Sequence, residues 1–179
     1  MEAREKFKFT WDLIGDIELG RPNLGPDVPV GVYRIMEYSF REAIEEAFGV
    51  DAGEKIIYLA GKRAGKMFFN NVLPKTDNFA DFVSNIQKYL KEYKIGIFRV
   101  EESDPSHENL IIAVSEDLDC SGLPEIGYGV CTFDEGFICG ILEEFTGREW
   151  QVKEIDCWCT GERTCRFSVK ILPDLIDDR

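Results

Sequence analysis

The sequence predicts a single α+β domain with an antiparallel sheet. In the segments 32–93 and 133–145, apolar residues recur at helical spacing. In the segments 95–114 and 150–171, apolar and polar residues alternate with a period of two, as they do in paired strands. With 179 residues the chain has the length of one domain and can bury a sizeable core.

Residues 1–29 are expected to form an N-terminal arm and a loop, ahead of a domain that spans residues 30–172. Residues 7–11 alternate apolar and polar side chains, which is typical of an edge strand, of an arm onto a partner or of a flap over a cavity. The segment from Gly20 to Gly31 carries three prolines and three glycines, so we expect a loop there. Residues 173–179 are expected to form an acidic tail.

Four amphipathic helices are expected: from residue 32 to a stop at 49, from 51 to 68, from 79 to 93, and from 132 to a stop at 147. Asp51 with Glu54, and Thr132 with Glu135, have the spacing of capping boxes and predict the starts of the second and fourth helices. The third helix follows a cap at Asn78.

The second helix carries only small residues at the centre of its inward face, namely Ala60, Gly61, Ala64 and Gly65. A glycine inside a helix costs about 1 kcal/mol relative to alanine, so two of them one turn apart indicate a purpose in packing or in making space. We favour a close helix crossing, and the wall of a ligand cavity is the alternative.

Two strands are expected at residues 95–100 and 110–114, joined by a turn-rich loop at 103–107. A hairpin then closes the sheet. Its strands are predicted from Trp150 to Asp156 and from Arg166 to Ile171, with a turn near Gly161.

Cys131, Glu154, Cys157 and Cys165 are spaced in a way that suits one metal ion. Across a two- or three-residue turn, Cys157 and Cys165 would be too far apart for a direct disulfide, but a tetrahedral zinc ion can span the gap. Cys131 precedes a predicted helix, whose N-terminal amides favour a thiolate. Glu154 would point away from Cys157 in a regular strand, so it needs a bulge or a strong twist to share the site.

Two other interpretations of the six cysteines stay open. They can be buried, reduced and packed as small apolar residues, or Cys159 and Cys165 can form a redox pair across the hairpin. Cys120 and Cys139 have no assigned role. Thiolates bind both zinc and iron, so the spacing does not decide between these metals.

Charge and missing motifs exclude several classes of function. The net charge of −13, from 34 acidic and 21 basic residues, argues against nucleic-acid and anionic-membrane partners. The N-terminus lacks the apolar core of a signal peptide and no apolar run reaches about 20 residues, so we expect a cytoplasmic protein. The single histidine, His107, lies in a loop, and no dinucleotide-binding glycine motif is present. No catalytic residue is assigned.

Over about residues 30–171 the chain resembles the 4-vinyl-reductase domain family. The resemblance depends on the segment from Ala60 to Gly65, on the helix opened by Cys131, and on the closing segment from Glu154 to Phe167. Members of this family include archaeal stand-alone proteins, a protein linked to bacteriochlorophyll synthesis, and the sensory domains of aromatic-responsive bacterial transcription activators. The fold is also similar to that of transport-particle tethering subunits.

The resemblance implies helices packed on a twisted antiparallel sheet and a zinc ion held by three cysteines and one glutamate. These ligands match Cys131, Glu154, Cys157 and Cys165. It also implies a pocket for a small aromatic or hydrocarbon ligand. We expect that pocket to be lined by Ala60, Gly61, Ala64, Gly65, Phe133 and Phe137.

Three functions follow as hypotheses. The first is a zinc-stabilised, homodimeric module that binds a hydrophobic or aromatic small molecule and acts through a separate output protein. The second is a reductase, or a substrate-delivery component, that acts on the vinyl groups of tetrapyrroles. The third is an assembly adaptor that uses its N-terminal arm with Phe7, Phe9 and Trp11 for protein contacts.

Overall fold

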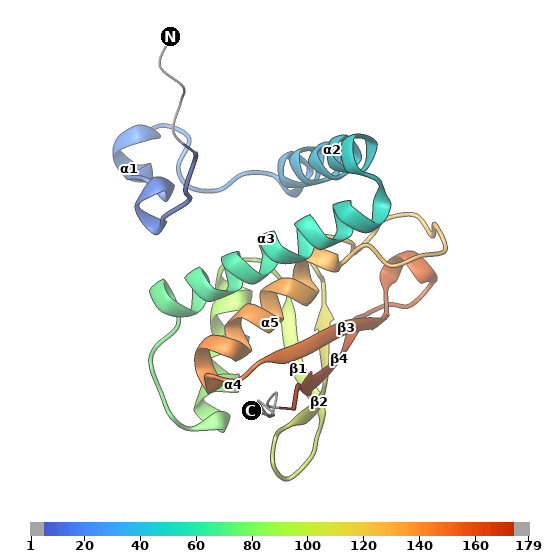
Figure 1. Ribbon diagram of the computed structural model, residues 1–179. Helices are drawn as coiled ribbons and strands as arrows, with labels where there is room; N and C mark the ends of the chain where they lie inside the picture. Colours follow the sequence, from blue (N-terminus) through green and yellow to red (C-terminus); the bar gives the residue numbers. More distant parts are fainter. Residues whose placement is uncertain (1–5, 174–179) are drawn as a thin grey trace.

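A four-stranded antiparallel sheet carries the domain in the computed structural model, which describes residues 6–173 (Figure 1). The strands follow the order β1-β2-β4-β3. Their bounds are Ile97–Ser103 for β1, Asn109–Ser115 for β2, Trp150–Asp156 for β3 and Cys165–Ile171 for β4. The predicted α+β class is therefore confirmed.

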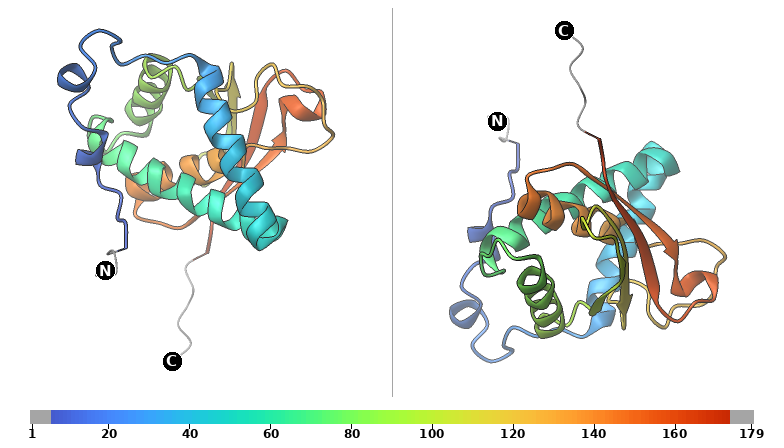
Figure 2. Two further views of the ribbon diagram at one scale, coloured as in Figure 1. Left: turned by 90° about the horizontal axis from the view of Figure 1, so that it is seen from above. Right: turned by 90° about the horizontal axis from the view of Figure 1, so that it is seen from below.

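Helices cover one face of this sheet in two layers (Figures 1 and 2). The α5 helix lies between the sheet and α3, and α2 crosses α3 on the side away from the sheet. The bounds are Trp11–Ile14 for η1, Ile17–Gly20 for α1, Val30–Phe48 for α2, Val50–Asn71 for α3, Phe79–Glu92 for α4, Thr132–Thr146 for α5 and Trp158–Thr160 for η2. Among the helices of residues 6–173, none is both long and apolar enough to cross a bilayer.

Alternation along β2 and β4 places one buried row of side chains against the helices. The cross-strand pairs on this face are Leu110 with Val169, Ile112 with Phe167, and Val114 with Cys165. Cys165 thus continues the apolar face of the sheet, and its thiol points into the core at one end of the row.

Four glycines allow α3 and α5 to touch backbone to backbone. A Cβ atom built on Gly61 or Gly65 would lie 2.0 or 2.1 Å from a carbonyl oxygen of α5, and one built on Gly136 or Gly140 would lie 2.1 or 2.2 Å from a carbonyl oxygen of α3. No side chain fits in such gaps. The prediction of a close helix crossing is confirmed, and the glycines of α5 are its counterpart.

The structure differs from the sequence-based expectations at the N-terminal segment and at the start of the second predicted helix. Residues 6–10 have no regular structure and lead into η1, so of the three interpretations of residues 7–11 the edge strand does not form. Asp51 does not cap the second helix, because α3 already begins at Val50. Gly49 has a φ of +83°, which lets this single residue end α2 and precede α3.

The predicted closing hairpin does not have a tight turn. Residues 157–164 separate β3 from β4 and include η2, with Gly161 in the left-handed conformation at its end. The third-helix cap is confirmed, because the side chain of Asn78 accepts a hydrogen bond from the backbone N–H of Asp81. The predicted acidic tail, apart from Pro173, lies outside the described residues.

Candidate metal centre

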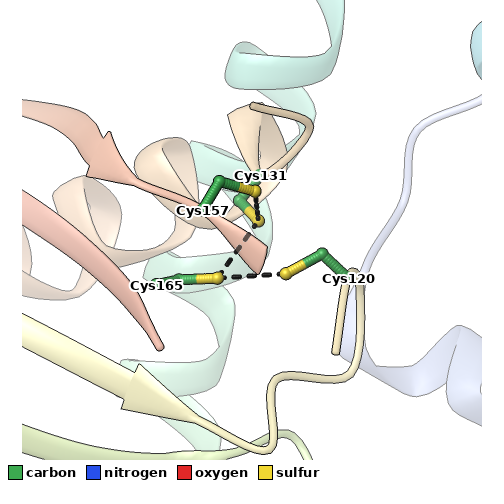
Figure 3. Close-up of side chains that lie close together, drawn as sticks. All are labelled: Cys120, Cys131, Cys157 and Cys165. Atoms are coloured by element: carbon green, nitrogen blue, oxygen red, sulfur yellow. Dashed lines mark hydrogen bonds between the residues drawn. The ribbon is translucent and has the colours of Figure 1, made fainter. Parts of the chain in front are cut away.

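Four cysteine thiols converge where β2 and β4 meet the start of α5 (Figure 3). Cys120 comes from the loop after β2, Cys131 immediately precedes α5, Cys157 follows β3, and Cys165 begins β4. All four Sγ atoms lie within 4.8 Å of one another, and each residue is at most 1% exposed. Secondary-structure ends from four parts of the chain therefore meet in one buried sulfur cluster.

The sulfur positions fit a tetrahedral zinc ion with a small adjustment. The Sγ atom of Cys131 lies 3.9 Å from that of Cys157 and 3.8 Å from that of Cys165. Zn–S bonds of about 2.3 Å in a tetrahedron place two sulfurs about 3.8 Å apart. The Sγ atoms of Cys120 and Cys165 are 3.0 Å apart, so this pair has to open by about 0.8 Å to reach the same spacing.

Hydrogen bonds among the thiols favour ionisation at one position. Contacts from Cys120, Cys131 and Cys165 lower the pKa of the Cys157 thiol. The same kind of contact with Cys120, Cys157 and Cys165, together with burial, raises the pKa of the Cys131 thiol. Cys157 is therefore the position in the cluster where these contacts favour the thiolate. A bound divalent cation would let the other thiols ionise as well.

Glu154 borders this cluster but does not belong to the set of four. The register of β3 and β4 shifts between Glu154 and Asp156, which is the kind of irregularity that the carboxylate needs in order to turn toward the cysteines. The carboxylate lies beside Gly129 and Cys157, since a Cβ atom built on Gly129 would be 2.2 Å from Oε2 of Glu154 and 3.7 Å from Cβ of Cys157. Burial raises the pKa of Glu154 to about 8. Its Oε1 atom is buried and has no hydrogen-bond partner.

Cys120 takes the place in the cluster that sequence reasoning gave to Glu154. Its position depends on Asp117, whose Oδ1 accepts hydrogen bonds from the N–H groups of Asp119 and Cys120 at 2.8 and 3.1 Å. The one local signal for this turn in the sequence was Asp117, three residues before Cys120, because an aspartate side chain can accept hydrogen bonds from backbone N–H groups that follow it. The other two cysteines lie outside the set: Cys139 contacts the carbonyl of Trp150, and Cys159 is buried beside the cluster.

All six cysteines are free thiols. The structure therefore contains no bond between Cys159 and Cys165, and Cys120 is the cysteine that approaches Cys165. Three buried carboxyl groups, from Asp117, Asp119 and Asp134, adjoin the sulfur cluster. Burial raises the pKa of all three, in the case of Asp119 to about 6.

An apolar cavity of about 350 Å³ lies between α2 and α3. Its lining consists of Tyr33, Met36, Glu37, Phe40, Arg41, Ile44, Ile56, Ile57, Ala60 and Phe133. Of the predicted pocket residues, Ala60 and Phe133 line this cavity. Gly61 and Gly65 contact the α5 backbone, Ala64 packs against the core, and Phe137 lines a much smaller interior cavity of about 20 Å³.

Three polar residues of α2, Tyr33, Glu37 and Arg41, line the α2–α3 cavity. The Tyr33 hydroxyl donates a 2.7 Å hydrogen bond to Oδ1 of Asp119, and Glu37 has both carboxylate oxygens buried without a partner. Burial, followed by the nearby Asp119, raises the pKa of Glu37 to about 8. Arg41 donates to the carbonyl of Val130 and is close enough to Glu37 to oppose that rise.

A family model described as the V4R domain matches residues 110–171, which include all four clustered cysteines. The uncharacterized protein MJ0150 of Methanocaldococcus jannaschii is 30% identical over 149 residues, which cover 83% of this chain and 79% of that protein. The family model covers the cysteine cluster, and the similarity to MJ0150 is long enough to include the helices that precede it as well.

Two solved structures share the fold at low sequence identity. A vinyl-4-reductase family protein from Methanocaldococcus jannaschii has a TM-score of 0.58 and 18% identity, over 83% of this chain and 85% of that one. The phenol-responsive sensory domain of the transcription activator PoxR, solved with phenol, has a TM-score of 0.60 and 12% identity, over 84% and 78% of the two chains. With a relative at 30% identity and a family model over its closing third, the chain belongs to the V4R, or vinyl-4-reductase, domain family.

Proposed function

We propose that this protein is a binding module for a hydrophobic or aromatic small molecule, stabilised by a structural zinc ion. The observation that carries the proposal is the apolar cavity between α2 and α3, which has the volume of a small-molecule site and a few polar groups on its α2 side. The PoxR sensory domain, which has a similar fold, was solved with phenol. A hydrophobic metabolite with one hydrogen-bonding group suits such a cavity.

The zinc ion would hold the domain together and perform no chemistry. Cys131, Cys157 and Cys165 would supply three thiolates, and Cys120 or Glu154 would complete the tetrahedron. When four protein ligands surround zinc, no position is open for an activated water molecule. Such an ion would tie the start of α5 to the ends of β3 and β4.

Filling the cavity tests the binding function. Phenylalanine in place of Ala60, whose side chain lines the cavity, would occupy its volume without contacting the cysteines. We expect Ala60→Phe to weaken binding of the neutral aromatic probe N-phenyl-1-naphthylamine by at least about tenfold, which corresponds to 1.4 kcal/mol. Fluorescence titration measures this change.

A matched control is Ala80→Phe, which adds the same ring to an exposed position on α4. This variant should bind the probe as the wild type does. Equal binding by the wild type and Ala60→Phe would show that the cavity is not the binding site, and the proposed function would lose its support.

Homodimer formation and a separate output protein are parts of the same proposal. Along α2, Val32 is 45% exposed and Ile35 is 70% exposed, and Phe7 of the N-terminal segment is 65% exposed. Exposed apolar groups of this size mark protein contacts. The adaptor hypothesis predicts the same surface, whereas the reductase hypothesis draws no support from a feature of the described residues.

The dimer prediction can be checked by light scattering after gel filtration. We expect a particle of twice the 20.5 kDa chain mass. Ile35→Glu should shift it toward the monomer by placing a charge on the α2 surface. Ile155→Glu changes an exposed apolar residue of β3 and should leave the mass unchanged. A wild-type monomer at all concentrations would contradict the dimer.

A further inference from the structure

We infer that Cys120 and Glu154 are alternative fourth donors to one metal ion that Cys131, Cys157 and Cys165 bind. The centre would then have five protein donors for four positions, and the ion could change between four-sulfur and three-sulfur, one-oxygen coordination without leaving the protein. This inference rests on the proposed metal centre.

The two candidates approach the three common cysteines from different sides. The Sγ atom of Cys120 is 3.0 Å from that of Cys165, whereas the Glu154 carboxylate lies in the space beside Gly129 and Cys157. Both donors are removed from water. Cys120 is fully buried, and Oε1 of Glu154 is buried without any partner. An unpartnered carboxylate oxygen is costly to bury, and a metal ion next to it would remove that cost.

Gly129 provides the space in which the Glu154 carboxylate lies. A Cβ atom at Gly129 would stand 2.2 Å from Oε2 of Glu154 and 3.7 Å from Cβ of Cys157. The φ angle of Gly129 is not in the left-handed region, so the backbone itself does not require glycine. The missing side chain therefore serves to admit the carboxylate, and alanine at this position would push it away from the cysteines.

The loop that carries Cys120 is held by α2 and not by the sheet. The guanidinium of Arg34 donates to the carbonyls of Leu118 and Ser121, both at 2.9 Å, and the Tyr38 hydroxyl donates to the carbonyl of Asp119 at 2.7 Å. The three common cysteines stand instead at the ends of α5, β3 and β4. Cys120 thus depends on a different set of contacts from the three common cysteines, and the proposed exchange would need a shift of this loop alone, with Glu154 taking the vacated position.

Cobalt(II) substitution followed by absorption spectroscopy tests the exchange, because the sulfur-to-cobalt charge-transfer band grows with the number of bound thiolates. The wild type should show four-thiolate binding. Cys120→Ala should keep one cobalt per chain, with a weaker charge-transfer band and visible bands shifted toward three-sulfur, one-oxygen coordination. Glu154→Gln alone should leave the wild-type spectrum unchanged.

The double variants decide whether Cys120 and Glu154 can replace one another. Cobalt affinity should fall by no more than about tenfold in each single variant, and by at least about a thousandfold in Cys120→Ala with Glu154→Gln, because no fourth protein donor is left. Cys120→Ala with Gly129→Ala should behave like that double variant while retaining both carboxylate oxygens. Far-UV circular dichroism confirms that each variant is folded, and Cys139→Ala, which changes a buried thiol outside the cluster, should match the wild type.

Three outcomes would overturn the inference. Effects of the two single changes that simply multiply in the double variant would show that Cys120 and Glu154 do not replace one another. Complete loss of cobalt from Cys120→Ala would make Cys120 an obligatory ligand, and complete loss from Glu154→Gln would do the same for Glu154. A wild-type protein that binds no cobalt would instead contradict the proposed metal centre itself, so the two failures are distinguishable.

Discussion

Cys165→Ala is expected to lower the zinc content of the protein and to lower the melting temperature by roughly 10 °C, equivalent to about 3–5 kcal/mol in the free energy of unfolding. Cys165 is 1% exposed, and its Sγ lies 3.0 Å from that of Cys120 and 3.8 Å from that of Cys131. Removing it takes away one of the three thiols that both proposed coordination modes need, and it opens the link between β4 and the start of α5. Metal analysis by mass spectrometry and thermal unfolding measure the two effects.

Cys139→Ala is the matched control for this prediction. Cys139 is as deeply buried as Cys165, but its Sγ contacts the carbonyl of Trp150 and not the cluster. We expect this variant to keep its zinc and to lose only the packing of one sulfur atom. Equal zinc loss in both variants would show that general unfolding, and not ligand removal, explains the result.

Gly61→Ala is expected to destabilise the domain by about 3 kcal/mol or more, because overpacking against backbone atoms cannot be relieved by a rotamer change. The added Cβ would lie 2.0 Å from the carbonyl oxygen and 2.9 Å from the carbonyl carbon of Phe133. The α3 and α5 helices would have to separate along their whole contact. Urea unfolding measures the loss, and the start of α5, which carries Cys131, would shift with it.

Gly31→Ala provides the contrast, since Gly31 lies in the first turn of α2 and a Cβ atom added to it would have no neighbouring atom within 4 Å. Alanine is a better helix residue than glycine by up to about 1 kcal/mol, so this change should be neutral or slightly stabilising. If Gly61→Ala were as well tolerated as Gly31→Ala, the direct backbone contact between α3 and α5 would be wrong.

Much of the fold follows from periodicity in the sequence. The helical spacing of apolar residues predicted α2, α4 and α5 within a few residues, and alternation predicted all four strands. The start of α3 was misplaced because Asp51 and Glu54 have capping-box spacing, whereas Gly49 joins the two helices directly. The tight closing turn was also wrong, because η2 and its flanking residues need more chain than a two- or three-residue turn.

The metal centre was predictable only in part. The spacing of Cys131, Cys157 and Cys165 pointed to one site because these residues stand at the ends of regular elements, and the structure brings their thiols together. Cys120 lies in an irregular loop whose path depends on hydrogen bonds from α2, more than 80 residues earlier. No local pattern encodes such contacts. The side to which Glu154 points likewise depends on a register shift between β3 and β4, which only the paired strands reveal.

Contacts between distant segments also explain why only some of the predicted pocket residues line the cavity. Gly61 and Gly65 were correctly placed on an inward face, whereas Ala60 is exposed, because a helix has neighbours on more than one side. Its glycines face α5, whereas Ala60 faces the cavity below α2. The polar groups of that cavity, from Tyr33 and Glu37, come from a helix that sequence reasoning treated only as an amphipathic element.

Native mass spectrometry of the protein purified under reducing conditions tests the central claim most directly. We expect the mass of the chain to increase by one zinc ion, with four protons displaced when all four bound thiols are ionised. We also expect a chelator to remove the ion and to lower the melting temperature. A wild-type chain that has all its thiols reduced, carries no metal and gains none from added zinc would contradict this claim.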